Sequence, residues 1–91
     1  MTVRVNIPAV LRSAVGGSKS LEGEAGPLRK VLEGLGDEFP ALKEQVFGAD
    51  GGMHRFVNVY INDEDVRYLE GMDTPVEDGD VVAILPAVAG G

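Results

Sequence analysis

The residues of this sequence that offer chemistry lie at its C-terminus. The last five residues, Ala-Val-Ala-Gly-Gly, are small and carry no charge apart from the terminal carboxylate of Gly91. Such a segment can thread a narrow tunnel in another protein, because glycine allows close backbone approach and unusual φ and ψ angles. The carboxylate would then be the reacting group, converted to an acyl-adenylate with ATP. The alternative is that Gly90 and Gly91 form an end without function.

Other reactive groups are scarce. The absence of cysteine excludes disulfides, thiolate metal sites and a cysteine nucleophile. His54 is the only histidine, so a zinc site is not expected. No GxSxG motif surrounds a serine, and no GxxxxGK[ST] loop is present to bind phosphates. We therefore expect a protein that is not an enzyme and binds no cofactor, with ATP and Mg²⁺ held by the partner that activates Gly91.

Size and charge narrow the class of protein further. The 91 residues suffice for one domain, and they contain neither an apolar run long enough to span a bilayer nor a secretion signal. We expect a cytoplasmic protein without a membrane partner. The net charge of −7 comes entirely from the residues after Ile61, where Arg67 is the only base. This acidity disfavours nucleic acid as a partner, and it indicates either docking to a basic protein or a solvated acidic face.

The N-terminal half predicts a hairpin followed by helices. Residues 2–7 alternate polar and apolar, which is typical of a half-buried strand, and a Gly-Gly turn leads to a second strand near residues 19–24. Pro27 suits the first position of a helix, which we expect Gly36 to end. The apolar stripe of this helix consists of Leu28, Val31, Leu32 and Leu35. Pro40 begins a second, short helix with Leu42 and Val46 directed inward, and residues 48–52 form a loop.

The C-terminal half predicts strands joined by tight turns. The clearest strand is RFVNVYIN, residues 55–62, with three β-branched residues on one face and Phe56 and Tyr60 on the other. NDED is a turn that leads to a short strand VRYL, residues 66–69. EDGD is another turn, with Gly79 at positive φ, and VVAILP forms the last strand. Together these elements predict an α+β fold, one sheet with a helix on its face.

The stretch DGDVVAILPAVAGG resembles the C-terminal signature of the MoaD/ThiS family of sulfur carriers. Val81 stands where that family often has Glu, and Ala87 where it often has a second Pro; the positions that match are Asp78, Gly79, Asp80, Pro86, Val88, Gly90 and Gly91. The resemblance implies a ubiquitin-like β-grasp domain over residues 1–86, with a mixed sheet of four to five strands and one main helix packed on one face. Its first and last strands would pair in parallel at the centre, and residues 87–91 would be a mobile tail.

The resemblance also implies a function. An E1-like adenylyl/sulfurtransferase of the MoeB/MoeZ/ThiF type would adenylate Gly91 and convert it to a thiocarboxylate, so the protein would be a co-substrate. The HRFVNVYINDEDVR and ILPAVAGG segments look closest to actinobacterial CysO-type carriers. Those carriers imply two further partners, a PLP-dependent cysteine synthase that accepts the sulfur and a metalloprotease that releases cysteine. Molybdopterin, thiazole and thiolated secondary metabolites are alternative destinations. Two other functions stay open, a ubiquitin-like modifier and a plain binding module.

The partner-docking surface is predicted around the end of the last strand. Phe56 and Tyr60 either face solvent and a partner or form core, depending on which face of their strand the helix covers. Leu85 is out of phase with its buried neighbours and is expected to dock the E1-like enzyme. The residues expected to follow it into the partner are Pro86, Ala87, Val88, Ala89, Gly90 and Gly91. By the same resemblance Arg55 could meet an acidic patch of a partner, whereas simple solvation is the plainer interpretation for His54.

Overall fold

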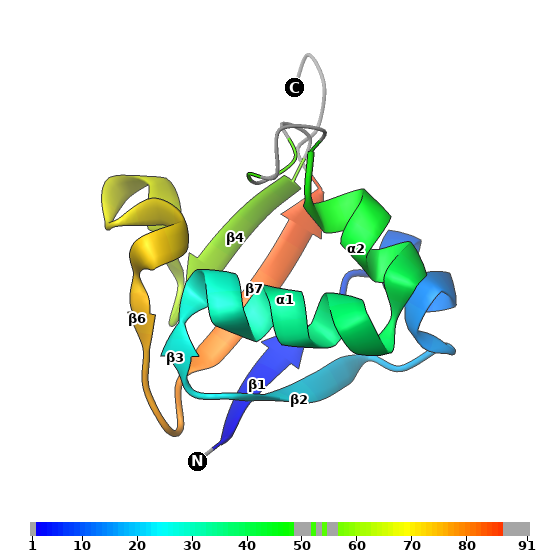
Figure 1. The fold of residues 1–91 in the computed structure, drawn as a ribbon, viewed down its shortest axis with the longest axis horizontal. Coiled ribbons are helices and arrows are strands. Elements are labelled where there is room, and N and C mark those ends of the chain that lie inside the picture. Colours follow the sequence, from blue (N-terminus) through cyan, green and yellow to red (C-terminus); the bar gives the residue numbers. More distant parts are fainter. Residues whose placement is uncertain (1, 49–51, 53, 55–56, 87–91) are drawn as a thin grey trace.

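The computed structural model describes residues 2–48, 52, 54 and 57–86, and it contains one main sheet with helices on one face (Figure 1). The strands of the main sheet are β1 (Thr2–Asn6), β2 (Ser20–Glu24), β4 (Val57–Ile61), β5 (Glu64–Asp65) and β7 (Val81–Pro86), in the spatial order β2-β1-β7-β4-β5. Two short strands, β3 (Gly26–Pro27) and β6 (Pro75–Val76), form a separate ladder. The helices are α1 (Leu28–Glu38) and α2 (Pro40–Val46), with 3₁₀ helices at Ala9–Val15, Val66–Tyr68 and Gly71–Asp73.

The first and last strands pair in parallel, as the resemblance implied. Val5 lies beside Val82 in the β1–β7 ladder, and β7 also pairs with β4 in the antiparallel sense. The other neighbours of the ladder, β2 and β5, pair antiparallel with β1 and β4. The sheet is therefore mixed, with β7 as its central strand, and the predicted ubiquitin-like β-grasp fold is confirmed.

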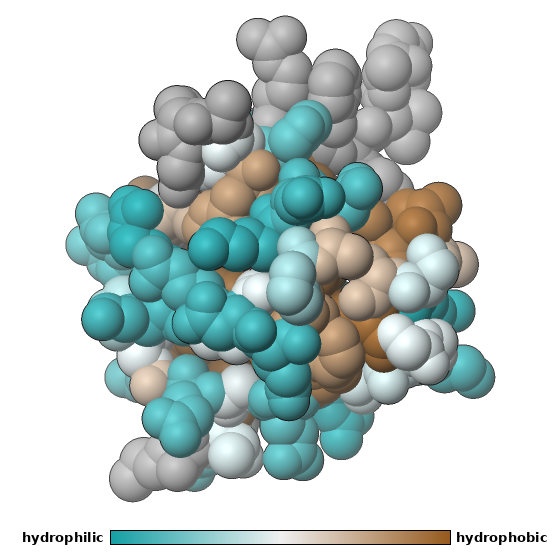
Figure 2. Space-filling view, turned by 45° about the vertical axis from the view of Figure 1, so that its right-hand side comes forward, coloured by the Kyte–Doolittle hydropathy of each residue, from teal (hydrophilic) through white to brown (hydrophobic). Residues whose placement is uncertain are grey.

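The core lies between the sheet and the helices. Figure 1 shows α1 crossing one face of the sheet, with α2 beside its C-terminal end. The predicted inward positions are all buried, namely Val3, Val5, Ile7, Val82 and Ile84 from the strands and Leu28, Val31, Leu32, Leu35, Leu42 and Val46 from the helices. Polar residues cover much of the surface, but Figure 2 shows apolar residues reaching it as well. Burial of this apolar set, at roughly 25 cal/mol per Å² removed from water, is the main stabilising contribution.

The helices start and end differently from the prediction in two places. Pro27 is not the first helical residue, because it stays extended (φ −57°, ψ 143°) and pairs with Pro75 in the β3–β6 ladder. Gly36 does not end α1, which continues to Glu38. Gly36 is instead a contact point between the helices, since a Cβ there would lie 2.9 Å from Cβ of Lys43 in α2. The chain leaves the helix at Phe39, where the following Pro40 disfavours helical geometry.

The predicted strand at residues 66–69 is wrong. Strand β5 consists of Glu64 and Asp65 alone, and Val66–Tyr68 is a turn of 3₁₀ helix. The carboxylate of Asp65 accepts a hydrogen bond from the Arg67 amide, which stabilises the turn in place of a continued ladder. The turn before β5 is as expected, with positive φ at Asn62 and Asp63, and Gly79 has the predicted positive φ of 88°.

Candidate functional site

The candidate site is the C-terminal end of β7, from which the last residues of the chain continue. This strand is paired on both sides, and its ladder with β4 extends to Pro86, which lies opposite Val57. A strand held at the centre of the sheet gives the following residues a rigid starting point. The predicted site residues Ala87, Val88, Ala89, Gly90 and Gly91 lie outside the described residues, as do Phe56 and Arg55.

The sheet face opposite the helices, called here the open face, is formed near this end by Leu85 and its cross-strand neighbours. Leu85 pairs with Asn58, and Ala83 pairs with Tyr60. The helices cover the other face of β4, where Val57 and Val59 are buried. Tyr60 is therefore partly exposed, and Leu85 is 43% exposed, as expected of a residue that docks a partner. Val81, on the same face, is 37% exposed, so apolar surface runs along β7.

An ion pair flanks this open face at the edge of the sheet. Asp65 lies opposite Tyr60 in the β4–β5 ladder, and its side chain is 8% exposed. The Arg67 guanidinium donates to both of its carboxylate oxygens, at 2.8 Å through Nη2 and at 3.2 and 3.3 Å through Nε. These side-chain hydrogen bonds and the bond from the Arg67 amide hold the pKa of Asp65 below its usual value, and the carboxylate raises the pKa of Arg67. Most of the Arg67 side chain stays exposed, so the open face has a cation at its rim.

The Asp-Gly-Asp motif before β7 binds two other segments to the start of that strand. Asp78 Oδ1 accepts from the Thr2 amide at 3.0 Å, and the Gly79 amide donates to the Thr2 carbonyl at 3.2 Å. Asp80 accepts from the Glu77 amide at 2.8 Å and from the Asn62 side chain at 3.0 Å. These bonds lower the pKa of Asp80, the amide of Glu77 contributing most. The sequence predicted a turn here and a match to the family signature, but not these contacts; the two acids flanking a glycine were the available signal that the motif also binds backbone amides.

Among the described residues, His54 and the acids form no metal site. The His54 amide donates to the Val46 carbonyl at 2.7 Å, which places the His54 backbone beside the last residue of α2. Across residues 2–48, 52, 54 and 57–86, no cluster of acids and histidine has the arrangement needed to hold a metal ion. Within the same residues, no helix has the length and apolar character required to cross a membrane. The described part of the chain therefore presents a surface that leads to the residues after Pro86.

Comparisons with known proteins agree with this arrangement. The model of the ThiS family matches residues 5–91 of the chain. The sulfur carrier protein CysO of Mycobacterium tuberculosis is 45% identical over 93 aligned positions, with 100% of both chains covered.

Solved structures with the same fold include two kinds of protein. One is CysO in the crystal structure of the Amycolatopsis orientalis BexX/CysO complex, which has a TM-score of 0.89 and 42% identity, with 98% of this chain and 99% of that chain covered. Another is the small archaeal modifier protein 1 of Methanosarcina acetivorans, which has a TM-score of 0.86 and 35% identity, with 99% and 96% covered.

Proposed function

Since this chain belongs to the ThiS family and is a sulfur carrier, we propose that it holds the sulfur as a thiocarboxylate on Gly91. The observation that carries this proposal is the family match, which runs through the central strand β7 and reaches residue 91. Leu85 and Tyr60 on the open face would dock the activating enzyme, and the residues from Pro86 onward would enter it. Gly90 would matter sterically, because a Cβ would press on a tunnel wall and make positive φ costly.

Two steps convert the carboxylate. A carboxylate oxygen of Gly91 attacks the α-phosphorus of ATP, which forms the acyl-adenylate and releases pyrophosphate. Sulfide then attacks the acyl carbon, the bond to AMP breaks, and the thiocarboxylate remains. The described residues of this chain offer no phosphate-binding loop, so an E1-like adenylyl/sulfurtransferase supplies that loop and the Mg²⁺. We place both steps in the cytoplasm.

We propose cysteine biosynthesis as the destination of the sulfur, because the full-length relative from Mycobacterium tuberculosis is a CysO. The receiving partner would be a PLP-dependent synthase, and a metalloprotease would release the product. The BexX/CysO complex supports the idea that carriers of this kind dock onto a second protein. Incubating the thiocarboxylate with such a synthase and O-phosphoserine should give a carrier extended by cysteine. An unchanged thiocarboxylate would redirect the proposal to molybdopterin, thiazole or another thiolated metabolite.

Intact-protein mass spectrometry tests the carrier chemistry. The full chain is incubated with an E1-like enzyme, ATP, Mg²⁺ and sulfide, and we expect a mass gain equal to the exchange of one oxygen for one sulfur. The matched control carries one alanine after Gly91, which moves the carboxylate about 3.5 Å beyond its site and should abolish the gain. If the extended chain gains sulfur equally, or if the folded wild type never gains it, the carboxylate of Gly91 does not receive the sulfur.

A second candidate function is conjugation to lysine, which the similarity to the small archaeal modifier protein favours. In that case the activated Gly91 forms an isopeptide bond with a lysine amine and AMP leaves. Lys19, Lys30 and Lys43 are exposed and would be available as acceptors on another copy. Immunoblots of cell extract distinguish the two functions, because a modifier produces ladders of larger conjugates that disappear when Gly91 is removed.

A further inference from the structure

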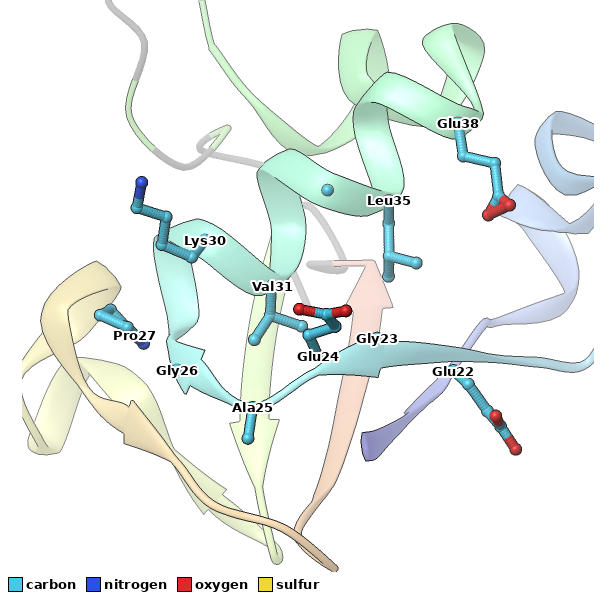
Figure 3. Close-up of a pocket in the computed structure, with 11 residues that line it drawn as sticks. Glu22, Gly23, Glu24, Ala25, Gly26, Pro27, Lys30, Val31, Leu35 and Glu38 are labelled. Atoms are coloured by element: carbon cyan, nitrogen blue, oxygen red, sulfur yellow. The ribbon is translucent and has the colours of Figure 1, made fainter. Parts of the chain in front are cut away.

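We propose that the groove between β2 and α1 binds an extended, basic peptide segment of a partner protein, which adds a strand to the free edge of β2. This inference does not rest on sulfur transfer. The groove has a volume of about 440 Å³ and is lined by β2, the turn through Ala25 to Pro27, and one side of α1 (Figure 3). Three observations support the proposal: the free hydrogen-bonding edge, the shape of the groove and its charge.

The register of β1 and β2 shows which backbone groups of β2 are directed toward its free edge. The Ile7 amide donates to the Lys19 carbonyl at 2.9 Å, which makes Ile7 and Lys19 a hydrogen-bonded pair. Pairs of this kind alternate along an antiparallel ladder, so Val5–Leu21 and Val3–Gly23 are also hydrogen-bonded. The amides and carbonyls of Ser20, Glu22 and Glu24 therefore point away from β1.

No other described strand takes up these groups. Strand β2 is the first in the sheet order and pairs only with β1 among the described residues. It has five residues, whereas β5 at the opposite edge has two. A five-residue edge with unpaired amides and carbonyls is the template for strand addition, in which the peptide backbone provides the hydrogen bonds and alternate side chains fill a pocket.

The groove has room for such side chains beside Gly34 but is narrow at Gly23. Gly23 faces α1, where a Cβ would come within 3.2 Å of Val31 Cγ1, so this part of the floor is narrow. A Cβ on Gly34 would have no atom within 4 Å, so the wall of α1 is open there. Figure 3 shows Val31 and Leu35 extending from α1 toward β2. Because Val31 and Leu35 are themselves buried, small side chains of an added strand would fit beside Gly34.

The charge of the residues that line the groove indicates a basic peptide. Glu22, Glu24 and Glu38 line the groove and are exposed, against a single lysine, Lys30. Arg4 lies opposite Glu22 in the ladder and offsets part of that charge on the sheet side. The excess of carboxylates favours lysine or arginine at the alternate positions of the peptide. It also disfavours a second copy of this chain, because two β2 edges would bring their glutamates together.

The groove lies away from the candidate sulfur site. Along the β1–β2 and β1–β7 ladders, Ser20 is level with Asn6 and Ala83, whereas Glu24 is level with Thr2, near the start of β7. The groove surrounds the Glu24 end of β2, and Pro86 lies at the opposite end of the sheet. A peptide on β2 would therefore leave the end of β7 uncovered, so that the partner could remain bound while sulfur is loaded or transferred.

NMR titration of the full chain tests the proposal with a capped peptide of alternating valine and lysine. We expect amide shift changes at residues 20–27 and along α1, and slower hydrogen exchange at the Ser20, Glu22 and Glu24 amides. A peptide with the same side chains but methylated backbone nitrogens should bind at least about tenfold more weakly, because it cannot donate to the edge. An alternating valine and glutamate peptide should bind at least about tenfold more weakly as well.

Variants separate the groove from general charge effects. Gly34→Leu adds a side chain to the groove wall at a position where a Cβ has open space, and it should weaken binding about tenfold. Glu22→Lys should weaken it by a similar factor, whereas Glu64→Lys makes the same charge change at the opposite edge, about 19 Å away, and should have little effect. Equal losses for the two lysine variants, equal binding of the methylated peptide, or shift changes confined to the open face would overturn the proposal.

Discussion

Asn62 and Asp80 are joined side chain to side chain, and this contact holds together the turn that ends β4 and the turn that begins β7. Asn62 Nδ2 donates to Asp80 Oδ1 at 3.0 Å, and Asn62 Oδ1 accepts from the Val81 amide at 3.0 Å. The Asn62 amide also donates to the Val81 carbonyl at 2.9 Å. Because β7 is the strand that leads to Gly91, this small network positions the beginning of the element on which the proposed function depends.

Removal of the Asn62 side chain should therefore destabilise the fold. We expect Asn62→Ala to lower the free energy of unfolding by about 2 kcal/mol, because the Asp80 carboxylate and the Val81 amide each lose a hydrogen bond to the Asn62 side chain. It also places an alanine at a φ of 49°, which glycine tolerates better. Asn62→Gly is the matched control and should cost less. Urea denaturation measures both variants, and an Ala variant as stable as the wild type would contradict the role of this network.

The two carboxylates with lowered pKa values predict how stability depends on pH. Hydrogen bonds in the folded protein hold the pKa values of Asp65 and Asp80 below the ordinary value of 3.8. The unfolded chain therefore takes up protons first as the pH falls. Their contribution is present above pH 3.8 and is lost as the pH falls through the folded pKa values. As the pH is lowered, the denaturation midpoint of the Asp80→Asn variant should fall less steeply than that of the wild type. Carbon NMR titration of the two carboxyls checks the cause, and midpoints at or above 3.8 would contradict it.

Gly34 and Gly36 should respond in opposite ways to substitution by alanine. Gly34→Ala adds a Cβ in open space and removes the entropic cost of a helical glycine, so stability should rise by about 0.5–1 kcal/mol. Gly36→Ala forces Cβ to 2.9 Å from Cβ of Lys43, so α1 and α2 must separate and stability should fall by about 1–3 kcal/mol. Thermal unfolding of the pair measures the difference, and a gain at both sites would show that the helices do not pack as described.

Leu85 should affect loading of sulfur without affecting folding. Leu85→Glu places a charge on the open face, where it should raise KM for the E1-like enzyme at least about tenfold while the unfolding midpoint changes little. Val10→Glu is the matched control, since Val10 is 69% exposed and lies in the 3₁₀ helix after β1. Equal effects of the two variants on KM would indicate a nonspecific effect of charge.

The acidic turn after β4 should have only a modest influence on docking. Asp63 and Glu64 are exposed, so Asp63→Asn or Glu64→Gln should change the association rate with a basic partner by a few-fold at low salt. The difference from the wild type should disappear as salt is raised. Stopped-flow measurements at two ionic strengths check this, and a salt-independent loss would instead indicate a direct contact with the partner.

The sequence by itself determined the elements whose signal is local. Strands β1 and β4 have period-two alternation, β7 is dense in β-branched residues, and α1 has its apolar stripe at helical spacing, so these elements followed from short windows. The order of these elements, together with the Asp-Gly-Asp and terminal Gly-Gly residues, carried the resemblance to the MoaD/ThiS family that implied the fold and the carrier function.

Only the tertiary structure decided what depends on residues distant in the chain. The alternation of β4 defined two faces but did not say which one α1 would cover, and packing buried Val59 and left Tyr60 partly exposed. Gly36 had the local signal of a helix end, but α1 continues past it and α2 packs against it. The Asn62–Asp80 contact and the free edge of β2 likewise depend on strand order and register. Local patterns specify which residues prefer to be buried, whereas the partners of those residues are chosen by the sheet as a whole.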